Sequence, residues 1–287
     1  MDRESMITVE NLTHVYPNGV EALCGVSLNV DRGEYLAIVG QNGSGKTTLA
    51  KHFNGLLRPT QGTIKVGGKD ASKARVSELS RIIGYVFQNP DDMLFCNSVE
   101  EEIGFGPRMI GCSKDEIQRR VAETIQILGL ESLQDQHPFA LSLGDRQRLA
   151  VACALSMQPE VFVFDEPTTG QDYFGGQRIM EIIDRLHTSG KTIIIITHDM
   201  QMVAEHAQRV VVMSGGKIAL DAPPAKAFTQ IELLEKLSLR PPQITRFAFQ
   251  MGWTDRAILN IREMCDVIRP QGSSPIAGNN GRGGNHG

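Results

Sequence analysis

A glycine-rich segment with one lysine is the first part of the chain that could carry out chemistry. It reads Gly40-Gln41-Asn42-Gly43-Ser44-Gly45-Lys46-Thr47-Thr48 and fits the pattern G-x-x-x-x-G-K-[ST]. The glycines of this pattern let successive backbone N–H groups turn toward a phosphate, and the lysine supplies a cation for the β- and γ-phosphates. The hydroxyl of Thr47 can bind Mg²⁺. These residues predict a site for a nucleoside triphosphate with Mg²⁺.

Two adjacent carboxylates, Asp165 and Glu166, follow the apolar run 161–164. An acid at the end of a buried strand can reach Mg²⁺ through water, and a second acid beside it can polarise an attacking water. We assign Asp165 to the metal and Glu166 to general-base catalysis. The alternative is a solvated sheet edge, which the glycine-rich segment disfavours. The two motifs together still leave kinases, GTPases, helicases and transport ATPases open.

The elements that must position these groups are those of an α/β protein. An apolar strand at 35–39 leads into the glycine-rich turn, and a helix is expected from about residue 46 to 57. Further apolar strands at 161–164 and 192–197 flank a helix at 174–188. This alternation predicts a mostly parallel sheet covered by helices.

The rest of the chain divides into further segments. Short alternating strands before residue 40 predict an N-terminal antiparallel section, and helical periodicity predicts a helical insertion at 89–157. We expect residues 1–222 to form the main domain and 223–270 a small helical C-terminal domain. Residues 271–287 are rich in Gly, Asn and Ser and are expected to be a disordered tail.

Composition excludes several classes of protein. Of the 287 residues, 41% are hydrophobic, which is enough to fill a core. The net charge of −4 argues against bulk binding of nucleic acid. Five cysteines stand singly, which disfavours a zinc site or a disulfide framework. We also expect neither a signal peptide nor a spanning segment, because no apolar run approaches the ~20 residues needed to cross a bilayer.

A third motif narrows the choice among nucleotide-binding proteins. The run 141–148, Leu-Ser-Leu-Gly-Asp-Arg-Gln-Arg, resembles the signature motif LSGGQ of ATP-binding-cassette (ABC) ATPases. Other landmarks of that family occur in the expected order, so that the resemblance covers about residues 6–220. They are Tyr16 for the aromatic ring that stacks on adenine, Gln88 for the Q-loop, Thr169–Asp172 for the D-loop and His198 for the switch histidine.

This resemblance implies a mechanism in which two such domains close head to tail. Each ATP would then lie between the phosphate-binding loop of one chain and the signature motif of the other, so that Ser142, Gly144 and Asp172 act in trans. His198 would hold the γ-phosphate and orient the attacking water. Gln88 would contribute to catalysis and metal binding, and would report the nucleotide state to a partner docked on the helical insertion.

Three positions depart from the pattern of the family. Leu143 replaces the first glycine of the signature, Asp145 replaces its glutamine, and Gln171 stands in the D-loop where leucine is more common. A carboxylate near a triphosphate is electrostatically unfavourable. Our hypothesis is a weakened signature surface, as would suit a heterodimer with one stronger site.

Two segments resemble the ATPase subunits of energy-coupling-factor (ECF) importers of vitamins and transition metals. Residues 87–106 follow the pattern Q-N-P-D-x-Q-x-F-x-x-T-V-x-x-E-x-x-F-G, with Met93 in place of the second glutamine. Residues 239–245 resemble the L-x-P-P-x-x-T segment of that group. The resemblance implies a C-terminal domain that helps to pair two ATPase subunits. It also implies membrane scaffold and substrate-binding subunits, with this chain peripheral on the cytoplasmic face of the membrane.

Acidic side chains on the ECF-like segment are candidates for docking. By resemblance, the scaffold presents arginine-bearing helices, to which these carboxylates would be complementary. They are Asp91, Asp92, Glu100, Glu101 and Glu102. A solvated acidic face is the alternative. The ATPase of another transporter class, a soluble ABC protein and a nucleotide kinase also remain open, and nothing in the sequence specifies the transported substrate.

Overall fold

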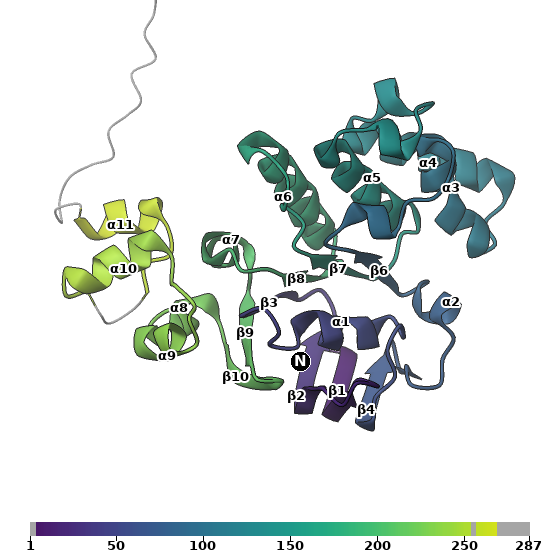
Figure 1. Ribbon diagram of the computed structural model, residues 1–287. Coiled ribbons are helices and arrows are strands. Elements are labelled where there is room, and N and C mark those ends of the chain that lie inside the picture. Colours follow the sequence, from purple (N-terminus) through teal and green to yellow (C-terminus); the bar gives the residue numbers. More distant parts are fainter. Residues whose placement is uncertain (1–3, 254–256, 269–287) are drawn as a thin grey trace, which may run out of the picture.

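The computed structural model describes residues 4–253 and 257–268. Its centre is a six-stranded sheet in the order β10-β9-β3-β8-β7-β6 (Figure 1). Five strands are parallel: β3 (Tyr35–Gly40), β6 (Ile83–Val86), β7 (Val161–Asp165), β8 (Thr192–Ile196) and β9 (Arg209–Ser214). Strand β10 (Lys217–Ala222) adds an antiparallel edge. Strands β3, β7 and β8 are buried along their whole length, as their uninterrupted apolar runs predicted.

A second, antiparallel sheet has the order β2-β1-β4-β5, as expected for the N-terminal section. Its strands are β1 (Ser5–Val15), β2 (Glu21–Asp31), β4 (Gln61–Val66) and β5 (Lys69–Asp70). Helix α1 (Lys46–Phe53) lies between the two sheets, where Leu49 and Phe53 are fully buried (Figure 1). The helix ends at Phe53 and not near residue 57, because Asn54 leaves helical geometry and Gly55 takes a left-handed φ of +74°.

The predicted helical insertion forms one end of the molecule (Figure 1). After the short helix α2 (Val76–Leu79) and strand β6, it consists of η1 (Pro90–Asp92), α3 (Val99–Met109), α4 (Lys114–Leu128), η2 (Glu131–Leu133), η3 (Pro138–Ala140) and α5 (Leu143–Ser156). Helices α3, α4 and α5 each begin after a serine whose hydroxyl accepts a backbone N–H three residues on: Ser98, Ser113 and Ser142. Their apolar faces share one core with β7.

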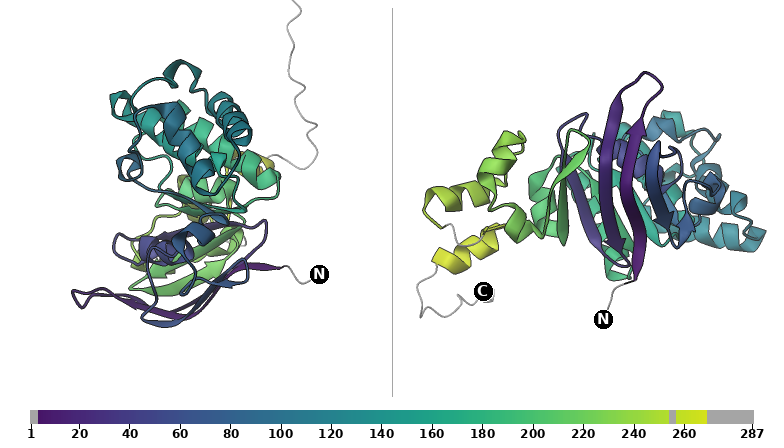
Figure 2. Two further views of the ribbon diagram at one scale, coloured as in Figure 1. Left: turned by 90° about the vertical axis from the view of Figure 1, so that its right-hand side faces the viewer. Right: turned by 90° about the horizontal axis from the view of Figure 1, so that it is seen from below.

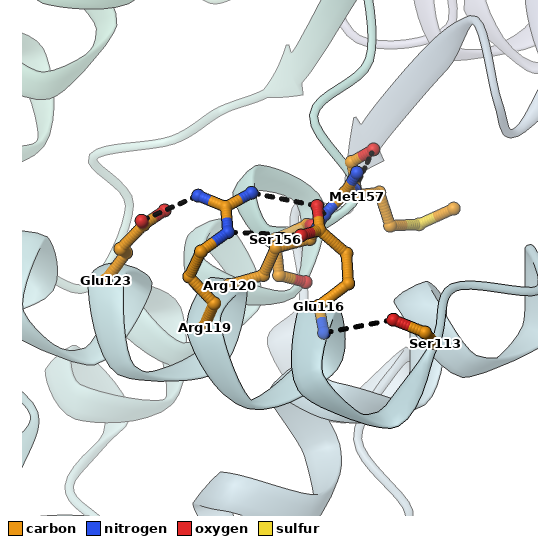
Figure 3. Close-up of polar contacts among 7 residues, drawn as sticks. All are labelled: Ser113, Glu116, Arg119, Arg120, Glu123, Ser156 and Met157. Atoms are coloured by element: carbon orange, nitrogen blue, oxygen red, sulfur yellow. Dashed lines mark hydrogen bonds and ion pairs between the residues drawn. The ribbon is translucent and has the colours of Figure 1, made fainter.

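An arginine joins two helices of the insertion (Figure 3). The guanidinium of Arg120 on α4 donates to the carbonyl oxygens of Ser156 and Met157, at 3.2 and 3.3 Å, where α5 ends. Its Nε also donates to Glu116 at 2.6 Å. Hydrogen bonds from Arg119 and Arg120 lower the pKa of Glu116 to about 2. The ion pairs within α4 therefore persist at neutral pH, and the hydrogen bonds from Arg120 to the two carbonyl oxygens hold α4 against the end of α5.

Helices at the C-terminal end lie on the side of the strands opposite to the insertion (Figure 2). After α6 (Tyr173–Thr188) and α7 (Met200–His206) come α8 (Pro224–Ala227), α9 (Ile231–Lys236), α10 (Gln243–Gln250) and α11 (Ile261–Ile268). Phe228 and Leu234 are buried in one cluster with Val39 of β3 and Val212 of β9, so the core continues across residue 222. The domain boundary at 222 stays a prediction, and the expected tail at 271–287 lies outside the described residues. Within the described part of the chain, no helix has the length and apolarity to cross a bilayer.

Candidate nucleotide-binding site

The glycine-rich segment connects the carboxyl end of β3 to the first turn of α1. Gly40 and Gly45 have φ angles of +153° and +103°, which residues with side chains rarely adopt. A Cβ on Gly40 would lie 2.3 Å from the carbonyl oxygen of Met213, and one on Gly45 would lie 2.6 Å from that of Ala22. Glycine is therefore required at both positions, because neighbouring backbone leaves no room for a side chain.

Two side chains of this loop fit a phosphate ligand. Nζ of Lys46 donates to the carbonyl oxygens of Gly40 and Gln41, at 2.8 and 2.9 Å, and burial lowers the pKa of this ammonium group. Oγ of Ser44 is buried and has no hydrogen-bond partner among the described residues. Because an unpaired buried hydroxyl costs free energy, a phosphate oxygen at this point would satisfy it.

The predicted metal ligands Thr47 and Asp165 meet across the sheet edge. Oγ1 of Thr47 donates to Oδ2 of Asp165 at 3.0 Å, and the hydroxyl of Tyr85 donates to the same oxygen at 3.0 Å. Burial raises the pKa of Asp165, while these two hydrogen bonds act in the opposite direction. A hydroxyl and a carboxylate fit Mg²⁺, which in nucleotide sites takes few protein ligands and completes its shell with phosphates and water.

Tyr85 is a site residue that the motifs did not reveal. It pairs with Val163 on the neighbouring parallel strand, two residues before Asp165. Because side chains two residues apart share a face of the sheet, Tyr85 and Asp165 had to lie on the same side. The role of Tyr85 could be recognised only from the pairing of β6 with β7, which no sequence motif contains.

The proposed general base, Glu166, is held from three directions. Its Oε1 lies 2.7 Å from Nδ1 of His198, and its Oε2 accepts from Oγ1 of Thr197 at 3.3 Å. Its backbone N–H donates to Ile196 at 2.8 Å while its φ is +51°, an uncommon value for a residue with a side chain. The side chain of His198 is 76% exposed and that of Glu166 only 12%. The carboxylate of Glu166 is thus buried and held in place, while its partner His198 is accessible to solvent.

Glu166 and His198 line a cleft of about 890 Å³, whereas Lys46, Thr47 and Asp165 lie outside its lining. The residues predicted for the site that line it are Gly40, Gln41, Asn42, Gln88, Glu166 and His198. Tyr16 lies outside this lining, where its hydroxyl is 3.0 Å from Oγ1 of Thr48 and its ring meets His14 edge-on. The opposite wall of the cleft comes from residues 238–243 and Arg246, which sequence reasoning did not assign to the site.

The signature residues form a separate network. Ser142 Oγ accepts the N–H of Asp145 at 3.2 Å and donates to Oδ2 of the same residue at 2.7 Å, while Arg148 forms an ion pair with Asp145. Burial alone would raise the pKa of Asp145, but the hydrogen bonds from Ser142 and Arg148 outweigh it and lower the pKa. Nε2 of Gln171 donates to the carbonyl of Gly144 at 3.3 Å. Asp145 therefore stays ionised, and its negative charge is balanced by Arg148 of the same helix.

The signature motif and D-loop line a different cavity, of about 520 Å³. Asp172 lies there as the cap of α6 and accepts the N–H of Gly175 at 2.6 Å. The structure does not bring Ser142, Gly144 or Asp172 to the phosphate-binding loop of their own chain. This separation agrees with the prediction that they act in trans, which remains a prediction.

The acidic segment differs from expectation. Glu102 is 3% exposed and accepts the backbone N–H groups of Phe95 and Cys96, at 2.8 and 2.6 Å. The prediction that it faces a partner is wrong, because its carboxylate satisfies the loop before α3. Asp91 forms an ion pair with Arg146 at 2.9 Å. The other three acidic residues of this segment, Asp92, Glu100 and Glu101, are exposed and form no ion pair with any residue that the structure describes.

A phosphate-binding loop, an acidic pair and a capped signature helix around a parallel sheet define an ATP-binding cassette. The family model described as ABC transporter matches residues 23–169. A putative ABC transporter ATP-binding protein of Caldanaerobacter subterraneus is 47% identical over 92% of this chain and 46% of its own length. The chain belongs to the ABC transporter family. It spans about half the length of the first curated relatives that it matches.

Other relatives are similar over nearly their whole length. The energy-coupling factor transporter ATP-binding protein EcfA of Methanocaldococcus jannaschii is 38% identical over 91% of this chain and 99% of its own. Among solved structures, cbiO1 of Clostridium perfringens, part of the ABC transporter complex cbiONQ, has a TM-score of 0.72 and 37% identity over 87% of this chain and 99% of its own. A dimeric cassette bound to ADP and phosphate, MJ0796, has a TM-score of 0.71 and 28% identity over 76% and 99%. These findings confirm the expected α/β cassette fold and the likeness to ECF ATPases.

Proposed function

We propose that this chain is the ATP-binding and hydrolysing subunit of an ECF-type importer of a vitamin or transition metal. The observation that carries the proposal is the assembly of Lys46, the Thr47–Asp165 pair and the Glu166–His198 pair at one sheet edge. Similarity to EcfA over nearly its full length supports the ECF assignment.

Each of the groups at this sheet edge has a task in hydrolysis. Lys46 exchanges its two carbonyl partners for the β- and γ-phosphates, a stronger charge-assisted interaction. Thr47 and Asp165 would hold Mg²⁺, which when bound neutralises charge that develops on the phosphates. Glu166 orients the attacking water and accepts its proton, and His198 fixes the carboxylate in position. Gln88 lines the cleft that contains Glu166 and His198.

The signature motif would complete the site of a second ATPase subunit. Ser142 and Gly144 lie at the N-terminus of the 14-residue helix α5, where the helix dipole favours an anion. The dimeric state of the cassette MJ0796 supports the pairing of two such subunits. We infer that the C-terminal helices contribute to this pairing.

A membrane scaffold would dock on the helical insertion, with this chain peripheral on the cytoplasmic face and a substrate-binding component beyond the scaffold. Phe95 and Met109 are 61% and 62% exposed there, and Phe95 is close in sequence to the exposed carboxylate of Asp92. Apolar side chains beside unpaired charge are typical of an interaction surface.

Two measurements test the proposal. The purified chain should hydrolyse ATP with Mg²⁺, and Lys46→Ala should remove this activity while the exposed Lys73→Ala does not. In the natural host, affinity purification from solubilised membranes should recover a membrane scaffold protein, and Asp92→Lys should reduce its recovery. Absence of hydrolysis would refute the ATPase role. Recovery of the chain without any membrane protein would refute the transporter role, and recovery of a scaffold of another class would refute the ECF assignment.

A further inference from the structure

The C-terminal segment reaches the catalytic cleft of its own chain. Leu239 is 6% exposed and packs in the cluster that contains Val39 of β3, while Pro241 and Pro242 are also buried. Because these residues are buried, the backbone at 239–242 has a fixed place. The exposed side chains on and around it, Ser238, Arg240, Gln243 and Arg246, line the cleft that also contains Glu166.

One hydrogen bond ties this segment to the phosphate-binding loop. Nε2 of Gln41 donates to the carbonyl oxygen of Leu237 at 2.8 Å. The next residue, Ser238, has a φ of +52°, which turns the chain sharply after that carbonyl. The carbonyl of Gln41 is at the same time a partner of Lys46, at 2.9 Å. When Lys46 turns to a phosphate, it releases the carbonyl oxygens of Gly40 and Gln41. Gln41 is the residue whose side chain holds the C-terminal segment.

Two arginines of this wall have no partner. Arg240 and Arg246 are exposed and line the cleft, and their guanidinium groups make no hydrogen bond or ion pair to any residue the structure describes. The same cleft is lined by residues 40–42 at the start of the phosphate-binding loop and by Glu166 and His198, while Lys46 and Thr47 lie outside its lining. It therefore adjoins the loop on the side of the proposed general base, where the terminal phosphate would be attacked. A guanidinium group there matches a phosphate in charge and in hydrogen-bond geometry.

We propose that residues 237–246 form an additional wall of the nucleotide site, with Arg240 and Arg246 binding the terminal phosphate of ATP held by the same chain. This inference rests on the proposed function and extends it. Gln41 connects the wall to the phosphate-binding loop. The C-terminal helices then distinguish ATP from ADP, because only ATP carries the group that the arginines bind.

The test compares two nucleotides on one protein. Full-length chain with Glu166→Gln, which prevents turnover, is titrated calorimetrically with MgATP and MgADP at protein concentrations below those of dimerisation. Adding Arg240→Gln and Arg246→Gln should weaken MgATP binding roughly tenfold or more, as expected for lost hydrogen bonds between charged groups. MgADP binding should change less than about twofold. Arg262→Gln, an exposed arginine of α11 outside this cleft, is the matched control.

The other outcomes are distinguishable. Unchanged MgATP affinity overturns the inference, as does equal weakening of both nucleotides. Unchanged affinity with loss of ATP-dependent dimerisation also overturns it and assigns the arginines to a second subunit. Gln41→Ala, which leaves both arginines in place, should weaken MgATP binding more than MgADP binding, and an equal effect on the two would contradict the proposed connection. If the parent protein binds no nucleotide, the proposed function itself fails.

Discussion

The phosphate-binding site is built from contacts between distant parts of the chain, whereas the signature surface is built within the first two turns of a helix. Thr47 and Tyr85 both reach Asp165, over 118 and 80 residues of sequence. Ser142, Asp145 and Arg148 instead follow one another at steps of three. The geometry of the phosphate-binding site is therefore fixed by the sheet. A single substitution on the signature surface can instead change the hydrogen bonds of Ser142 without affecting the fold.

The largest effect is expected at the general base in the cleft. Glu166→Gln keeps the size and the hydrogen-bonding capacity of the side chain but removes the proton acceptor. Steady-state hydrolysis should fall by about 10²–10⁴-fold, while MgATP binding persists. A fall of less than tenfold would assign the base to another group.

A mixing experiment tests the division of labour between the two regions. Lys46→Ala disables the cleft and Ser142→Ala weakens the signature surface, so each chain alone should be impaired. If each site combines one cleft with the signature of another chain, mixed dimers of the two variants regain one intact site. Hydrolysis should then rise on mixing to a substantial fraction of the wild-type rate. Activity equal to the mean of the two variants would show that the regions act within one chain.

Stability should also separate the two regions. Tyr85→Phe leaves the buried carboxylate of Asp165 with one hydrogen bond fewer, and the free energy of unfolding should fall by about 1.5–3 kcal/mol. Asp145→Gln breaks a partly exposed ion pair and should cost only about 0.2–1 kcal/mol. Urea denaturation of the two variants provides the comparison, and an equal loss would remove the distinction between a fixed cleft and an adaptable surface.

The smallest effect is expected for the unusual signature residue. In the structure the hydroxyl of Ser142 donates to Asp145, so ATP must compete for it. Asp145→Gln, which restores the usual residue, should therefore raise turnover by a few-fold. This increase corresponds to the net free energy of about one hydrogen bond that no longer competes with ATP. The measurement is the hydrolysis rate at saturating ATP. An unchanged rate would show that Arg148 already cancels the effect of the carboxylate.

The sequence predicted those parts of the site that are written in consecutive residues. The loop 40–48, the acid pair at 165–166 and the order of the motifs required only local patterns, and so did the buried strands that carry them. Tyr85, Gln41 as a link to Leu237, and the position of Arg246 could not be predicted in this way. Each depends on which strands are neighbours or on how the C-terminal helices pack, and local periodicity does not determine either.

Two expectations were wrong because a local property was outweighed by packing or backbone geometry. Glu102 has the charge of a surface residue, but its carboxylate is buried and accepts two backbone N–H groups of the loop before α3. The helix from residue 46 continues in pattern to 57, but a left-handed glycine at 55 ends it early. In both cases the local sequence was compatible with the observed structure but did not determine it.

The shared core of the cassette and its C-terminal helices limits how such proteins can be shortened or recombined. Phe228 and Leu234 fill the same cluster as Val39, the residue before the phosphate-binding loop. A gene truncated after residue 222 would encode a protein with an apolar hole beside its active site. Exchange of C-terminal segments between relatives should therefore succeed only where these side chains are exchanged together.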